Sequence, residues 1–110
     1  MLLVCRYDRP PDPGTDAAWL ERAHRAVTLL AAQPGCRGVE LARATEDPAA
    51  WVLVGVFDSL ADYRRALSPF DVREHVVPFL ADARTDAPAT FERRLTGDAT
   101  GTVEHPGVLS

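Results

Sequence analysis

Residues 51–57 read WVLVGVF, and this short run decides the fold. Side chains alternate along a strand, so the run has two faces. One face carries Trp51, Leu53, Gly55 and Phe57, and the other carries Val52, Val54 and Val56. An antiparallel strand with one face in water would alternate apolar with polar residues. Here both faces are apolar, which predicts a strand covered on both sides.

The rest of the chain places this strand third in an order of strand, helix, strand, strand, helix, strand. Short apolar or alternating runs predict strands at 1–7, 36–44, 51–57 and 89–95. An apolar stripe at helical spacing predicts a helix at 16–33, and two further helical pieces are expected at 60–67 and 69–77. The order predicts an α+β, ferredoxin-like βαββαβ fold, with a four-stranded antiparallel sheet and helices on one face. We expect one domain over residues 1–95 and a C-terminal tail at 96–110.

Capping residues set the expected helix boundaries. Thr15 or Asp16 can cap the first helix, and the Pro34-Gly35 pair ends it. Ser59 followed by Asp62 resembles a capping box for the second helix. Ser68 is expected to cap the piece that begins at Pro69, and Pro78 is expected to kink or restart the helix.

The apolar second face of WVLVGVF implies a partner. Two helices can cover only one face of a four-stranded sheet, so the other face needs a separate cover. The simplest cover is the same face of a second copy. The sequence therefore predicts a homodimer whose sheets pack face to face.

Composition excludes several classes of function. The 110 residues carry a net charge of −4, which does not indicate a nucleic-acid partner, and no apolar run is long enough to span a bilayer. All twelve basic residues are arginine, and lysine, asparagine and isoleucine are absent, which indicates a GC-rich genome and favours a bacterial source. Cys5 and Cys36 are expected to be free thiols of a cytoplasmic protein, and no metal-ligand spacing occurs.

Three motifs together resemble one family. They are the PGC-G turn at 34–38, the charged loop before a VLV strand, and the F-D-S-x-x-x-Y entry into the second helix at 57–63. The later S-P-F … H-V-V-P-F stretch at 68–79 fits the same pattern. Over about residues 1–95 the chain resembles the antibiotic biosynthesis monooxygenase (ABM) family of dimeric α/β barrels. The resemblance implies a cavity between helices and sheet, and a dimeric barrel.

The resemblance also implies candidate catalytic residues. Tyr63 stands where oxygenating members have a cavity tyrosine, and its phenol could bind a substrate hydroxyl. Arg73 stands near a family arginine proposed to hold anionic oxygen. His75 stands at the axial position of the haem-degrading branch, and either His75 or His24 could be a general base. Each of these residues also has an ordinary interpretation as a core or solvated side chain.

Four aromatic residues and one histidine are candidates for substrate binding: Tyr7, His24, Trp51, Phe57 and Phe79. Phe57 stands where oxygenating relatives often have Trp, which puts a role that depends on an indole in doubt. Tyr7 stands about where the haem branch has Asn, and the helix Trp of that branch is missing. Haem cleavage is therefore disfavoured by these departures.

These observations favour a cofactor-independent monooxygenase that oxidises a phenolic or anthrone-like polyketide with dioxygen, without metal. Two alternatives stay open. One is a haem-binding or haem-degrading monooxygenase with His75 as ligand. The other is a non-oxidative, cyclase-like enzyme or a small-ligand binding protein of the same fold.

Overall fold

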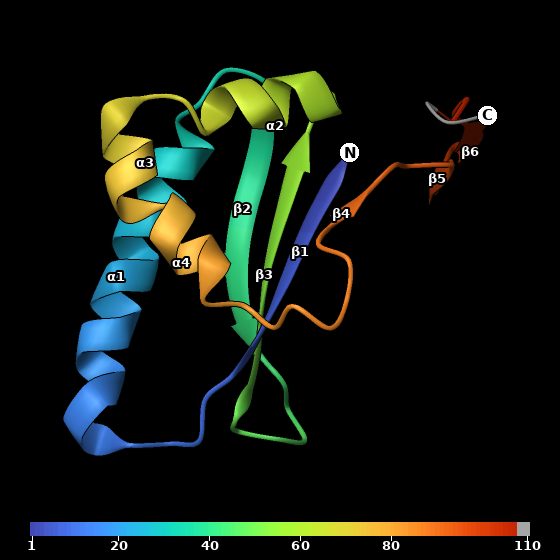
Figure 1. The fold of residues 1–110 in the computed structure, drawn as a ribbon. Coiled ribbons are helices and arrows are strands. Elements are labelled where there is room, and N and C mark those ends of the chain that lie inside the picture. Colours follow the sequence, from blue (N-terminus) through green and yellow to red (C-terminus); the bar gives the residue numbers. More distant parts are fainter. Residues whose placement is uncertain (108–110) are drawn as a thin grey trace.

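A computed structural model of the chain describes residues 1–107 (Figure 1). The strands are β1 (Leu2–Asp8), β2 (Cys36–Arg43), β3 (Ala50–Phe57), β4 (Thr90–Phe91), β5 (Leu95–Asp98) and β6 (Gly101–Glu104). The helices are α1 (Pro13–Ala31), α2 (Leu60–Ala66), α3 (Phe70–His75) and α4 (Val77–Ala81).

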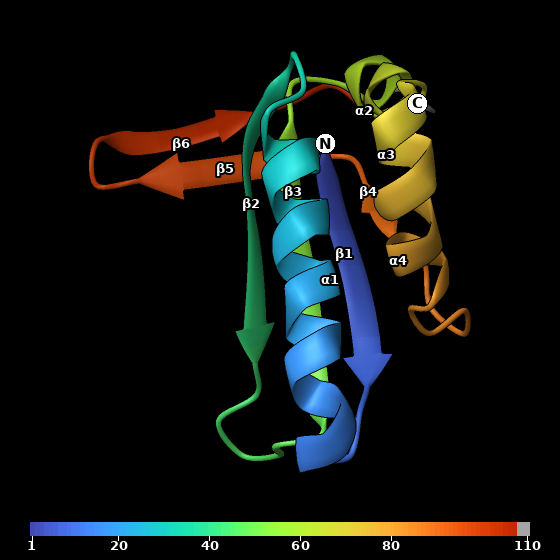
Figure 2. The same cartoon turned by 90° about the vertical axis from the view of Figure 1, so that its left-hand side faces the viewer.

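The main sheet has the predicted ferredoxin-like topology. Its strand order is β2-β3-β1-β4, and every neighbouring pair is antiparallel. All four helices lie on one side of this sheet, as Figures 1 and 2 show from two directions. The prediction of an α+β fold with helices on one face is confirmed.

β3 has the two-faced character that its sequence predicts. Leu53 and Phe57 are fully buried toward the helices. Val52, Val54 and Val56 are half-buried on the other side, where the described residues place no helix. This second side is called the open face below. The register of β1, β2 and β3 places eleven residues on it: Leu2, Val4, Arg6, Asp8, Gly38, Glu40, Ala42, Ala50, Val52, Val54 and Val56.

The core fills the layer between helices and sheet. α1 contributes a stripe of buried residues at helical spacing, from Trp19 to Leu30. The largest fully buried side chains are Leu3, Leu30, Leu53, Phe57, Val72, Val76 and Phe79. Both cysteines are free, and Cys5 is buried, as expected for core thiols. Within residues 1–107 no helix is long and apolar enough to cross a membrane.

The first helix begins earlier than predicted. Its N-cap is Asp12, whose side chain accepts a hydrogen bond from the Gly14 amide at 2.9 Å, so the expected cap at Thr15 or Asp16 is wrong. Pro13 follows at the first helical position, where its fixed φ suits a helix and its missing N–H costs nothing. The Asp-Pro pair therefore starts α1 three residues ahead of the sequence-based boundary.

The two predicted serine caps have different outcomes. Ser59 caps α2, because its Oγ accepts from the Asp62 amide at 3.1 Å. Ser68 does not cap α3: the N-cap residue is Pro69, and Ser68 donates to the Arg65 carbonyl at 2.8 Å. Ser68 thus closes the end of α2, which leaves its hydroxyl unable to begin the next helix.

The C-terminal segment departs most from the prediction of a single strand over 89–95. Only Thr90–Phe91 joins the sheet, and Leu95–Asp98 pairs instead with Gly101–Glu104 in a hairpin. The turn is closed by Asp98, whose carboxylate accepts from the Thr100 amide at 2.8 Å. Figure 1 shows this hairpin apart from the body, on the side of the open face, and Figure 2 shows it running crosswise beyond β2.

Candidate functional site

Tyr63 lies on α2 with its ring against the core. The ring contacts Phe57 edge-on, with centroids 5.2 Å apart. Burial raises the pKa of Tyr63 to about 12, so its phenol is neutral at physiological pH. Its hydroxyl makes no hydrogen bond with any described residue. Packing therefore fixes the ring of Tyr63, and its neutral phenol can donate a hydrogen bond to a ligand.

Tyr7, the other tyrosine, has a structural environment. Its hydroxyl donates to the Phe79 carbonyl at 2.9 Å, and burial raises the pKa of this phenol above its usual value. The ring packs against Trp19 at 5.6 Å and Phe79 at 5.0 Å. Trp51 extends the cluster, with its ring 5.2 Å from that of Trp19. Three candidates for substrate binding, Tyr7, Trp51 and Phe79, are thus brought together in one aromatic cluster.

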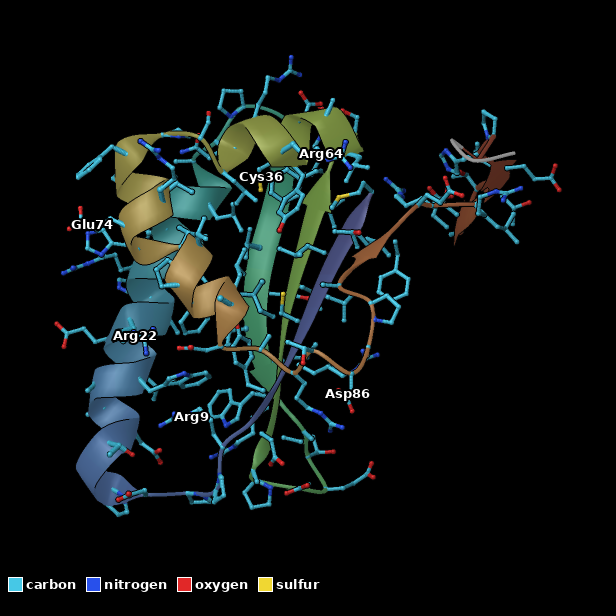
Figure 3. The ribbon with its side chains drawn as sticks, in the orientation of Figure 1. Arg9, Arg22, Cys36, Arg64, Glu74 and Asp86 are labelled. Atoms are coloured by element: carbon cyan, nitrogen blue, oxygen red, sulfur yellow. The ribbon has the colours of Figure 1, made fainter. Side chains whose placement is uncertain are left out.

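The three remaining polar candidates lie toward the outside of the helical layer. Arg73 on α3 and His24 on α1 are exposed. The side chain of His75 is 33% exposed, and its Nε2 lies 3.9 Å from a carboxylate oxygen of Glu74. Glu74 points away from the sheet (Figure 3). His75 is therefore the best placed of the three to exchange a proton with a ligand at the edge of the core.

The haem alternative can be tested on the packing around His75. The neighbours Val72 and Val76 are fully buried, as is Phe79 one turn further on. These side chains fill the layer into which the plane of a haem would have to enter, so the residues present do not fit that group. No cluster of three or more potential metal ligands occurs among the described residues.

The surface over the described residues is hollowed in several places, and none of five such hollows is lined by Tyr63, Arg73, His75 or His24. One hollow of about 360 Å³ lies at the end of the sheet beside Asp47. Tyr7, Trp51 and three arginines contribute to its lining: Arg6, Arg43 and Arg84. The guanidinium of Arg43 lies 5.4 Å from the ring centre of Trp51. This hollow joins a flat aromatic wall to positive charge.

A second hollow, of about 470 Å³, has a mostly apolar lining between α2 and the C-terminal segment. Leu60, one turn before Tyr63, lines it together with Phe91, Arg93 and His105. A hydrogen bond of 2.9 Å joins the His105 ring to Thr96. His105 lies in the segment 96–110, which the sequence predicts to be a C-terminal tail. Only the pairing of β5 with β6 brings it back to the body, and no local motif signals that pairing.

Arg9 forms the lower end of the aromatic cluster. Its guanidinium lies 4.6 Å from the ring centre of Trp19 and 3.8 Å from the Asp16 carboxylate. Its Nε is buried and has no hydrogen-bond partner among the described residues. Figure 3 shows Arg9 beside the lower part of the sheet. Sequence reasoning passed over this residue, because the Pro-rich loop around it carries no functional motif.

Solved structures share this fold. The likeness to SnoaB, a cofactor-independent oxygenase from Streptomyces nogalater, has 22% identity and a TM-score of 0.65, over 84% of this chain and 92% of that one. Rv0793 from Mycobacterium tuberculosis matches with 15% identity and a TM-score of 0.60, over 84% and 95%. A protein from Nitrosomonas europaea that carries the family's name matches with 15% identity and a TM-score of 0.58, over 98% and 99%. That last likeness extends through the hairpin.

The family is shown by the sequence itself. No curated protein gives a significant match. The sequence model of the family described as "antibiotic biosynthesis monooxygenase" matches residues 3–76, which is more than half of the 110 residues. The match contains the first three strands and the helices α1 to α3, and it confirms the resemblance carried by the turn, loop and helix-entry motifs. The chain belongs to the antibiotic biosynthesis monooxygenase family.

Proposed function

We propose that this protein is a cofactor-independent monooxygenase that oxidises a phenolic or anthrone-like polyketide to a quinone. The observation that carries the proposal is the Tyr63 phenol, which is neutral, held by its ring and without a partner among residues 1–107. Family membership and the fold shared with SnoaB support the class of reaction.

The chemistry of such a substrate needs little from the protein. A base removes a proton from the activated carbon, and the delocalised anion transfers one electron to dioxygen. The radical pair then combines to a hydroperoxide, which loses water to give the carbonyl of the quinone. One CH₂ group and one O₂ thus become one C=O group and one H₂O. The protein contributes orientation, exclusion of water and stabilisation of the anion.

The residues take the following roles in this proposal. Tyr63 donates a hydrogen bond to an oxygen of the substrate, which orients the ring and stabilises negative charge on that oxygen. His75 serves as the base, since it is less exposed than His24 and adjoins the buried core. Arg73 is exposed in the single chain, so a role in holding anionic oxygen requires it to lie close to the bound substrate.

The proposed enzyme acts as a homodimer whose open faces pack against one another. The support is the apolar character of that face, where three valines of β3 are half-buried although no described segment covers them. Apolar surface of this kind is stabilised when a partner removes it from water.

The test is oxygen consumption by the purified, metal-free protein with anthrones and naphthols. The proposal expects turnover, and it expects Tyr63→Phe to lower kcat/KM by about 10- to 100-fold, the usual effect of removing one hydrogen bond to a developing charge. Tyr7→Phe is the matched control, because that hydroxyl is occupied by the Phe79 carbonyl. His75→Ala should lower kcat, whereas His24→Ala should not.

Absence of oxygen consumption with every anthrone and naphthol would contradict the proposal. Turnover that Tyr63→Phe leaves unchanged would remove Tyr63 from the mechanism. Titration of the protein with haemin adds an independent readout: a Soret shift that disappears in His75→Ala would favour the haem alternative.

A further inference from the structure

Arg93, between β4 and β5, has no partner for its charge among residues 1–107. Ten of the twelve arginines are exposed, and only Arg9 and Arg93 are half-buried. The guanidinium of Arg9 contacts the Trp19 ring and lies 3.8 Å from the Asp16 carboxylate. Arg93 makes no hydrogen bond, ion pair or ring contact with a described residue. A half-buried charge without a counter-charge is unfavourable, so Arg93 is a place where an anion can bind.

The mostly apolar hollow beside Arg93 has room for a small molecule. Its volume is about 470 Å³, within the range of ligand pockets. The N-terminus, the start of α2 and β4 lie at the same end of the main sheet in both views (Figures 1 and 2). Met1, Leu60, Phe91 and Pro106 give the hollow its apolar wall. Phe91 is 38% exposed, so a ligand that covers its ring would remove apolar surface from water.

The ring of His105 belongs to the same lining and has a fixed orientation. Its Nε2 lies 2.9 Å from the Thr96 hydroxyl, and its backbone amide donates to the Arg94 carbonyl at 2.9 Å. Its Nδ1 makes no hydrogen bond with a described residue. His105 therefore adds a flat ring and one available polar atom to the wall that contains Arg93.

The two carboxylates that line the hollow have cations beside them. The Asp58 carboxylate accepts from the Arg37 guanidinium at 2.6 Å. The Glu92 carboxylate lies 3.9 Å from the Arg94 guanidinium. Each carboxylate is thus matched by an arginine other than Arg93, which leaves the charge of Arg93 uncompensated.

A second positive group lies close to Arg93. The amino group of Met1 donates to the Phe57 carbonyl at 3.0 Å. Burial lowers the pKa of this amino group, and the nearby charge of Arg93 lowers it further. The charge that remains in the hollow is therefore positive, which favours an anionic ligand over a neutral or cationic one.

We propose that this hollow binds a small organic carboxylate with an apolar body, and that the carboxylate pairs with Arg93. The guanidinium suits a carboxylate, because two of its N–H groups can donate one hydrogen bond to each oxygen. The apolar body lies against Leu60 and Phe91. Tyr63 does not line the hollow, so the inference goes beyond the proposed oxygenase reaction and does not depend on it.

Arg93 also contributes to two neighbouring hollows, of about 300 and 620 Å³. The first contains the carboxylate of Asp98, which would repel an anion. The second lies against Leu2 and Val56 of the open face and has no histidine in its lining. The hollow of about 470 Å³ is therefore the one that joins Arg93 to both an apolar wall and a second polar group.

Titration of the full chain with 2-naphthoate, followed by calorimetry and ¹H–¹⁵N NMR, tests the proposal. We expect saturable binding of one molecule per chain, with the largest amide shifts at Leu60, Phe91, Arg93 and His105. 2-Naphthamide has the same rings without the charge and should bind at least about tenfold more weakly, because it cannot form the ion pair. Inorganic phosphate has charge without an apolar body and should also bind at least about tenfold more weakly.

Substitutions separate the two parts of the site. Arg93→Gln should lower the affinity for 2-naphthoate by about tenfold or more and leave that for 2-naphthamide within about twofold. Phe91→Ala should lower both affinities, because both ligands use the apolar wall. Arg64→Gln is the matched control, since Arg64 is exposed on α2 and lines none of the five hollows. Thermal melts report folding, and Phe91→Leu replaces Phe91→Ala if that variant does not fold.

The results that overturn the proposal are distinct. No saturable binding of 2-naphthoate at millimolar concentration would overturn it, as would equal affinities for 2-naphthoate and 2-naphthamide or an unchanged affinity in Arg93→Gln. Amide shifts centred on Tyr63 would place the ligand in the proposed oxygenase site, and shifts centred on Gly101 or Val56 would place it in a neighbouring hollow; either overturns the proposal. Arg93→Gln should consume oxygen at the wild-type rate, so failure of this site and failure of the oxygenase function are separate results.

Discussion

At the scale of single residues, the two tyrosines differ in how their hydroxyls are used. The Tyr7 hydroxyl joins β1 to α4 through the Phe79 carbonyl, whereas the Tyr63 hydroxyl has no partner among the described residues. We expect Tyr7→Phe to lower the free energy of unfolding by about 1–2 kcal/mol, since it leaves a buried carbonyl unpaired. Tyr63→Phe should change it by less than about 0.5 kcal/mol. Urea denaturation of both variants measures this, and equal losses would show that the Tyr63 hydroxyl has a structural partner.

The pH dependence of the free energy of unfolding above pH 10 reports the burial of Tyr63. Its pKa rises from 10.0 to about 12 on folding, so the unfolded chain releases this proton first. The corresponding stability is complete below pH 10 and is lost as the pH rises from 10 to about 12. Burial also raises the pKa of Tyr7, Cys5 and Cys36, but these groups are the same in the wild type and in Tyr63→Phe, so the difference between the two proteins isolates Tyr63. Tyr63→Phe should lose less free energy of unfolding between pH 10 and 12 than the wild type, and an identical loss would contradict the assigned burial.

Sequence reasoning found Tyr63 and missed His105, for a physical reason. Tyr63 follows the F-D-S pattern at a fixed distance, and its helix, its cap and its aromatic contact are all local. His105 reaches the body only because its amide pairs with the Arg94 carbonyl across the hairpin. Such pairing depends on a turn closed by Asp98 and not on a repeating pattern in the sequence.

At the scale of elements, α2 lies between two serines that look alike in sequence. Ser59 caps α2, whereas Ser68 bonds to the last turn of the same helix. Ser59→Ala should lower the free energy of unfolding by about 1 kcal/mol, the usual value of an N-cap. Ser68→Ala should lower it by less than about 0.5 kcal/mol, because its bond is exposed. Thermal or urea melts compare the two, and a larger effect at Ser68 would contradict the assigned caps.

The elements that the sequence predicts correctly have a strong hydrophobic period. The strand predicted at 89–95, which the structure does not contain as a single strand, has no such period. α1 has a stripe of buried residues, and β3 has two apolar faces. In both elements the residues that the sequence pattern places toward the core are the ones that are buried. The segment 89–95 has only two large apolar residues, Phe91 and Leu95. Because so few side chains favour the main sheet, its last residue, Leu95, pairs with Glu104 in the hairpin instead. The start of α1 was misplaced because Pro13 was read as a loop residue, although proline suits a first helical turn.

At the scale of the whole molecule, the helices cover one side of the main sheet and no described helix covers the other. Val54 lies at the centre of the open face, with Val4 and Glu40 as its cross-strand neighbours. Val54→Asp should convert the proposed dimer to a monomer, since it places two carboxylates in the middle of an apolar interface. Leu20→Asp is the control, because Leu20 is 42% exposed on α1. Sedimentation that finds a dimer in Val54→Asp would place the interface elsewhere.

The two apolar faces of β3 could be predicted from the seven residues 51–57, whereas the position of the hairpin could not. An apolar second face follows from alternation alone, and the structure confirms which valines occupy it. The hairpin departs crosswise from the sheet (Figure 2), and the His105 amide donates to the Arg94 carbonyl at 2.9 Å where its two ends meet. Local propensity contains no information on such a direction.

The strand order also governs how the chain can fold during synthesis. β1 lies inside the sheet, yet its neighbours β3 and β4 come from much later in the chain, with Leu2 opposite Val56 and Leu3 opposite Thr90. At ribosomal rates of about 5–20 residues per second, β1 leaves the ribosome several seconds before either neighbour exists. Its apolar side chains must wait in the nascent chain, where α1 is the first element able to shield them. Slow codons between α1 and β3 would lengthen that interval and should increase aggregation of the newly made protein.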